Sequence, residues 1–119
     1  MHADEARGGR DVLAAARLDN ATAATVATTL QALATPSRLL ILTALRHSPH
    51  SVTELATGIG MEQSAISHQL RLLRTLGLIT RRRDGRRIVY SLYDDHVAQL
   101  LDQAVHHTEH LRLGIRGTP

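Results

Sequence analysis

The stretch that decides the fold is residues 51–77, SVTELATGIGMEQSAISHQLRLLRTLG. Ser51 and Glu54 have the spacing of a capping box, which predicts a short helix over 53–59 that stops at Gly60. A longer helix is predicted over 62–76, and its buried face is formed by apolar residues at helical spacing, Ile66, Leu70 and Leu73. A short helix, a turn containing glycine and a longer helix make a helix-turn-helix.

The exposed face of the longer helix carries side chains that can reach base edges in a DNA major groove, Gln63, Ser64, Ser67, His68 and Arg71. A solvated helix surface is the alternative interpretation, because such a surface is polar as well. Solvated surfaces usually carry glutamate and lysine, however, and this face has neither. We therefore expect these five residues to contact DNA.

After Gly77 the period of the apolar residues changes from helical to alternating, which predicts two strands over 78–83 and 86–92. One face of the second strand is expected to carry Ile88, Tyr90 and Leu92. Asp84-Gly85 between the strands is a strong signal for a two-residue hairpin. The predicted fold is therefore mainly α with a β-hairpin wing, that is, a winged helix-turn-helix.

The wing is rich in arginine, with Arg81, Arg82, Arg83, Arg86 and Arg87. Guanidinium groups bind phosphate oxygens, and such a cluster is otherwise unfavourable because its charges repel one another. A solvated run of charge is the alternative, but the run follows directly on the helix-turn-helix. We assign phosphate contacts to Arg81, Arg83, Arg86 and Arg87.

Upstream of the helix-turn-helix, the sequence predicts two further helices. Asn20 is a plausible N-cap for the first, which extends to about residue 34, and Thr35-Pro36 starts the second. Residues 1–19 are expected to be a flexible N-terminal arm. The DNA-binding and dimerisation domain is expected over 20–113, with a C-terminal tail over 114–119.

The last apolar-periodic segment, residues 93–111, predicts a terminal helix with an apolar stripe, Val97, Leu101, Ala104, Thr108 and Leu111. His96 and His107 return to nearly the same azimuth beside this stripe, with His110 next to them. His96 and His107 lie about 16 Å apart along one helix. This is too far for both to bind one metal ion, because its nitrogen ligands lie at about 2.1 Å.

Two copies packed antiparallel on the apolar stripe would solve this problem, because a two-fold axis brings Asp94 and His96 of one chain next to His107 and His110 of the other. The sequence thus predicts a homodimer, formed through its terminal helices, with two equivalent metal sites. Unremarkable histidines on a polar helix flank are the alternative interpretation.

The composition limits the kinds of metal ligand that the chain can offer and argues against a membrane protein. The chain has 119 residues, no cysteine, no Phe or Trp, 14 basic residues that are all arginine, and a net charge of +3. Any bound metal therefore has only nitrogen and oxygen donors. No apolar run approaches a membrane span and residues 1–5 lack the apolar core of a signal peptide, so we expect a cytoplasmic protein with no membrane partner.

Three stretches carry a family resemblance: residues 33–39 (LATPSRL), 63–70 (QSAISHQL) and 85–90 (GRRIVY). Together with the order of the elements, they resemble the ArsR/SmtB repressors over about residues 20–114. The terminal patterns YDDHVAQLLD (93–102) and HTEHL (107–111) are similar to those of the family's nickel and cobalt sensor. One departure is Arg112, which stands where that sensor has a further histidine.

The resemblance implies a homodimeric repressor of a metal-efflux gene that binds operator DNA and leaves it when Ni²⁺ or Co²⁺ binds. It gives ligand roles to Asp94, His96, His107 and His110. A zinc-responsive repressor is one alternative, since four ligands of this type suit tetrahedral zinc, and a repressor answering to a non-metal signal is another. An enzyme is not expected, because a catalytic zinc needs an open position in a cleft and the apolar stripe predicts a site buried between helices.

Nickel and cobalt prefer five or six ligands, so a site with four would have open positions. The arm can supply two further donors, the α-amine of Met1 and the imidazole of His2. An incidental histidine in a disordered tail is the alternative.

Overall fold

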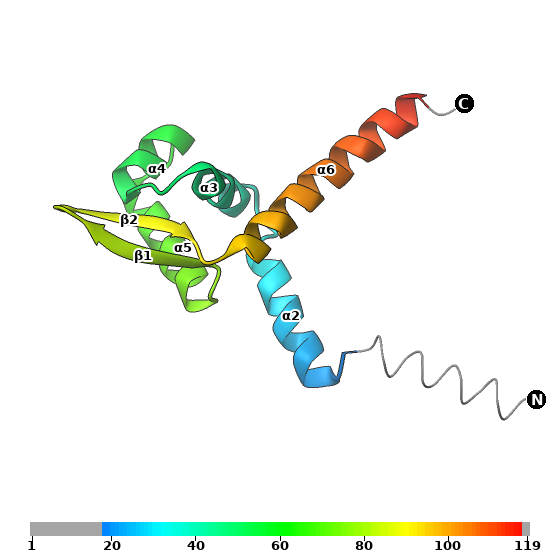
Figure 1. Cartoon of the computed structure of the whole chain (residues 1–119), viewed down its shortest axis with the longest axis horizontal. Helices are drawn as coiled ribbons and strands as arrows, with labels where there is room; N and C mark the ends of the chain where they lie inside the picture. The colour runs from blue at the N-terminus through cyan, green and yellow to red at the C-terminus, as the bar shows by residue number, and fades with distance from the viewer. Residues whose placement is uncertain (1–17, 118–119) are drawn as a thin grey trace, which may run out of the picture. The chain divides into compact units, whose positions relative to one another are not determined.

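The computed structural model describes residues 18–117, and the side chains of residues 18–114. Its elements follow in the order α2 (Asn20–Ala32), α3 (Pro36–His47), α4 (Val52–Ile59), α5 (Gln63–Thr75), β1 (Ile79–Asp84), β2 (Arg87–Leu92) and α6 (Asp95–Gly117) (Figure 1). The chain divides into two units, residues 1–31 and residues 32–119. The mainly helical fold with a hairpin wing is confirmed.

In the first unit, α2 is capped by Asp19 and not by Asn20 as expected. The backbone N–H of Thr22 donates to Oδ1 of Asp19 over 2.7 Å, and this hydrogen bond lowers the pKa of the Asp19 carboxyl. Asp and Asn are equally good cap residues, so the sequence pattern could not choose between neighbours. The helix ends at Ala32, two residues before the expected end.

In the second unit, α3 begins as the sequence predicts. The side chain of Thr35 accepts a hydrogen bond from the backbone N–H of Arg38, and Pro36 occupies the first turn. Ile41, Leu42 and Leu45 are buried in the core, to which α4, α5, both strands and α6 also contribute.

The helix-turn-helix forms with both hydrogen bonds of the capping box. The backbone N–H of Ser51 donates to Glu54 over 2.9 Å, and that of Glu54 donates to Ser51 Oγ over 3.2 Å. Gly60 ends α4 at φ +80°, a conformation that favours glycine. The predicted core face of α5 is fully buried: Ile66, Leu70 and Leu73 are each 0% exposed.

The wing is an antiparallel hairpin whose turn differs by one residue from the expected Asp84-Gly85. Asp84 pairs with Arg87, which leaves Gly85 and Arg86 as the turn. Gly85 has φ +66° and is the only described turn residue here with positive φ. A hairpin with glycine at its first central position is typical of a type II′ turn, and this geometry fixed the register.

Strand β2 is buried on both of its faces. Tyr90 joins the core, while its neighbour Val89, which points the opposite way, is only 1% exposed. Helices α3, α4 and α6 all contact β2. Two backbone hydrogen bonds also join His50 to β2. The N–H of His50 donates to the carbonyl oxygen of Tyr90 over 3.1 Å, and the N–H of Tyr90 donates to that of His50 over 2.8 Å.

Helix α6 is anchored only at its start. Val97 and Leu101 are 7% and 4% exposed, whereas residues 102–113 are exposed throughout. Within residues 18–117, no helix combines the length and apolar character needed to cross a membrane.

The capping box predicts a local stability effect. Ser51→Ala should lower the free energy of unfolding by about 1 kcal/mol, because it removes the acceptor for the Glu54 N–H. Urea unfolding followed by circular dichroism measures this. Thr53→Ala, an exposed hydroxyl of the same helix, is the matched control, and equal losses in both variants would contradict the assignment.

Candidate nucleic-acid interface and metal ligands

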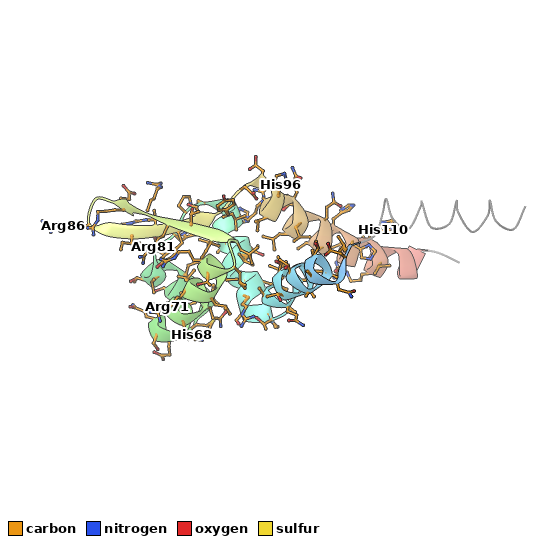
Figure 2. All side chains as sticks on the ribbon, turned by 90° about the horizontal axis from the view of Figure 1, so that it is seen from below. His68, Arg71, Arg81, Arg86, His96 and His110 are labelled. Atoms are coloured by element: carbon orange, nitrogen blue, oxygen red, sulfur yellow. The ribbon has the colours of Figure 1, made fainter. Side chains whose placement is uncertain are left out.

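The outer face of α5 presents the residues expected to contact bases. Gln63, Ser64, His68 and Arg71 are exposed, and Ser67 is half-buried beside them. Figure 2 shows His68 and Arg71 projecting from the same side of the helix. The helix is held from behind by its buried leucines and isoleucine, so this polar face is rigidly presented.

The wing holds its arginines away from the core. Arg81, Arg82, Arg83 and Arg86 are all exposed, and Figure 2 shows Arg86 at the tip of the hairpin. The register places Arg81 and Arg83 on one face of β1, with Arg82 on the other. Among the described residues, no carboxylate lies within ion-pair distance of these four arginines. Their charge is therefore available to a polyanion.

Arg87 is placed differently from the other wing arginines. Its Nη2 lies 2.9 Å from Oε1 of Glu54, the carboxylate that also accepts the Ser51 N–H. The pKa of Glu54 lies below its usual value, mainly because of the backbone hydrogen bond from Ser51, with a smaller contribution from the Arg87 charge. Arg87 thus ties the wing to the first helix of the helix-turn-helix. The sequence pattern identified Glu54 only as a capping residue and missed this link.

Asp94 and His96 lie together at the start of α6. Oδ1 of Asp94 accepts the backbone N–H of Val97, and its Oδ2 lies 3.2 Å from Nδ1 of His96. The pKa of Asp94 is lowered, chiefly by the hydrogen bond with His96. The carboxylate is therefore ionised at neutral pH, and the His96 side chain is 89% exposed.

His107 and His110 lie far along the same helix. His107 is about 16 Å from His96 by helical rise, and Figure 2 shows His96 and His110 on distant turns. The ring of His110 stacks on His106 with centroids 6.5 Å apart. Within the described part of the chain, no three histidine or acidic side chains form a metal-binding group. Met1 and His2 lie outside the described residues.

The donors at the two ends of α6 nevertheless suit a transition metal. Three imidazoles and one carboxylate provide nitrogen and oxygen ligands of the kind that zinc, nickel and cobalt accept. All four side chains are exposed in the single chain. A second chain would have to bring the two ends together.

The comparisons with known proteins agree with this architecture. The family model for the bacterial regulatory proteins of the arsR family matches residues 35–81. The regulator NmtR of Mycobacterium tuberculosis is 69% identical over 100 residues, covering 84% of this chain and 83% of NmtR. The SmtB repressor homologue of Synechocystis is 44% identical over 78 residues, covering 66% of this chain and 59% of that protein.

Two solved structures have the same fold. The solution structure of apo-NmtR has a TM-score of 0.70 at 70% identity and covers 83% of both chains. The homodimeric winged helix-turn-helix DNA-binding domain from Mycobacterium bovis has a TM-score of 0.71 at 31% identity, covering 79% of this chain and 89% of that one. The resemblance stated from the sequence is confirmed.

The exposed wing predicts a sequence-independent contribution to DNA binding. Arg86→Gln should weaken binding to a selected DNA site and to random duplex by the same factor, and lower the slope of log affinity against log salt by about one. Fluorescence anisotropy at several salt concentrations measures this. Arg112→Gln removes the same charge from α6 and should leave the slope unchanged. A loss confined to the selected site would show that Arg86 contacts bases instead.

Proposed function

Since the chain belongs to the arsR family of bacterial regulatory proteins, a DNA-binding family of transcription regulators, we propose that it is a metal-responsive repressor. In this proposal a homodimer binds operator DNA in the cytoplasm and is released by Ni²⁺ or Co²⁺, which derepresses a gene for metal efflux. The observation that carries the metal response is the placement of four ligand side chains at the two ends of α6.

DNA binding follows from α5 and the wing. Two recognition helices related by a two-fold axis reach successive major grooves when their centres lie about 34 Å apart. The base contacts are assigned to Gln63, Ser64, Ser67, His68 and Arg71. The phosphate contacts are assigned to Arg81, Arg83, Arg86 and Arg87, the last of which must exchange Glu54 for a phosphate or bind both.

The exposed part of α6 supports the dimer. Leu100, Val105, Leu111 and Leu113 are 39 to 61% exposed, although they belong to a helix whose first turns are buried. A two-fold axis across this helix would cover Leu100 and Leu111, which lie on one side of it at about 20° of azimuth from each other. The homodimer of the Mycobacterium bovis relative is a precedent for this assembly.

The same axis supports the metal site. Antiparallel α6 helices would bring Asp94 and His96 of one protomer against His107 and His110 of its partner, twice per dimer. A Ni²⁺ or Co²⁺ ion bound there would cross-link the two helices, and these metals accept further donors that tetrahedral zinc does not. The protein's part is to supply the Asp94 carboxylate, whose pKa is lowered, and three imidazole side chains.

Release from DNA requires only a modest free-energy coupling. Cross-linking the two α6 helices would bias the dimer toward a spacing of the recognition helices that fits the grooves poorly. Coupling in the usual range of about 1 to 3 kcal/mol weakens DNA binding about 5- to 150-fold. By linkage, DNA must weaken metal binding by the same factor.

A gel-shift titration with Ni²⁺, Co²⁺ and Zn²⁺ in turn tests the proposal. We expect Ni²⁺ and Co²⁺ to weaken binding of the dimer to its DNA site by about 5- to 150-fold. Release by Zn²⁺ alone would favour a zinc sensor. The absence of any effect would favour a repressor that answers to a non-metal signal.

The shared site predicts complementation between two inactive variants. His96→Ala and His107→Ala homodimers should both bind DNA but lose the metal response, because each lacks a ligand in both sites. A mixed dimer of the two should regain one intact site, measured as about half the metal stoichiometry by calorimetry. Gln103→Ala, an exposed residue on the same helix, is the control and should respond normally. A mixed dimer that binds no metal would exclude the two-chain site.

A further inference from the structure

Among the residues whose side chains are described, one directed side-chain interaction joins α6 to another element of its unit. Nε and Nη2 of Arg46, in the last turn of α3, donate to Oδ1 and Oδ2 of Asp102 over 3.3 and 3.1 Å. Asp102 is the first exposed residue after the buried anchor of α6. The pair therefore lies at the boundary between the docked and the exposed part of the helix.

A second polar link connects the other end of α3 to the recognition helix. Ser37 lies in the first turn of α3 and Gln69 on α5, between the expected base-contacting residues and the core. Nε2 of Gln69 donates to Ser37 Oγ over 3.1 Å, and Ser37 Oγ lies 3.4 Å from Gln69 Oε1. Both side chains are half-buried, so this contact is shielded from bulk water.

The two links lie on opposite sides of the same rigid element. Ser37 and Arg46 are nine positions apart, which corresponds to about 13.5 Å of rise and half a turn of azimuth. Helix α3 therefore contacts α6 at one end and one side, and α5 at the other end and the other side. Figure 1 shows α3 next to the first turns of α6.

We infer that α3 is the element that couples α6 to the recognition helix, with Arg46 and Asp102 as positioning residues. The inference rests on the proposed function, because it explains how an event at the exposed part of α6 reaches the DNA-contacting face of α5. A rotation of α6 pulls the carboxylate of Asp102, and with it the last turn of α3. The first turn of α3 then displaces Gln69 and the recognition helix.

The polar pair suits this role better than the apolar contacts of α6. Val97 and Leu101 hold α6 in place, but apolar packing has little directional preference and tolerates a small rotation. A carboxylate bound by two parallel N–H groups has a defined geometry, so it reports the orientation of the helix. Since both side chains are about half exposed, at 45% and 54%, the pair contributes little to folding stability.

The test is to measure metal affinity and DNA affinity separately in the full-length dimer. Asp102→Asn should change the affinity for Ni²⁺ and the metal-free affinity for DNA by less than about twofold. It should reduce the Ni²⁺-induced weakening of DNA binding by about 1.5- to 5-fold, the range for an exposed ion pair. Ser37→Ala, at the other end of α3, should reduce the same quantity. Thermal unfolding confirms that each variant is folded.

Charge reversal provides the decisive control. The double variant Arg46→Asp with Asp102→Arg should recover the Ni²⁺ effect, because the pair is restored with its charges exchanged. Gln99→Ala, an exposed change on α6 without a side-chain partner among the described residues, should retain it fully. An unchanged Ni²⁺ effect in Asp102→Asn, or no recovery in the double variant, would overturn the role of α3 while leaving the metal response intact. If Ni²⁺, Co²⁺ and Zn²⁺ each leave the DNA affinity of the unsubstituted protein unchanged, the proposed function and this inference are both refuted.

Discussion

The rest of the structure depends on one constraint: only the first turns of α6 pack against the core of their own chain. Val97 and Leu101 complete the core, and no described side chain between residues 102 and 113 is buried. Helices in proteins gain most of their stability from the packing of an apolar face. The exposed leucines and valine of α6 therefore lack a packing surface among the described residues, and the four candidate ligand side chains lie at the start of this helix and along its exposed part.

The DNA-binding part differs from α6, because hydrogen bonds and an ion pair within the chain join its elements to one another. Glu54 accepts from the backbone of Ser51 and from the side chain of Arg87, so one carboxylate links the start of α4 to the end of the wing next to its turn. The hydrogen bonds between His50 and Tyr90 join the same two regions. The wing and the first helix of the helix-turn-helix thus keep a fixed relation.

The sequence predicted what is encoded locally and missed what depends on distant partners. Ser51, Glu54 and Gly60 mark helix ends by their own chemistry, and Ile66, Leu70 and Leu73 mark a core face by their spacing. The cap of α2 and the hairpin turn were each misplaced by one residue, because neighbouring residues fit the local pattern equally well. The Arg87 to Glu54 and Arg46 to Asp102 pairs join residues 33 and 56 positions apart, which no periodicity reveals.

The candidate metal ligands show a similar limit of sequence-based prediction. Helical spacing selects these residues, but it cannot bring them together in space. Asp94 and His96 contact each other within one turn, whereas His107 lies about three turns farther along the same helix, with His110 beyond it. Their exposure in the single chain follows from physical chemistry, because burying an unpaired charged or polar side chain would be costly. The four candidate side chains therefore stay solvated in the single chain, and the core around Leu70 and Ile41 packs without them.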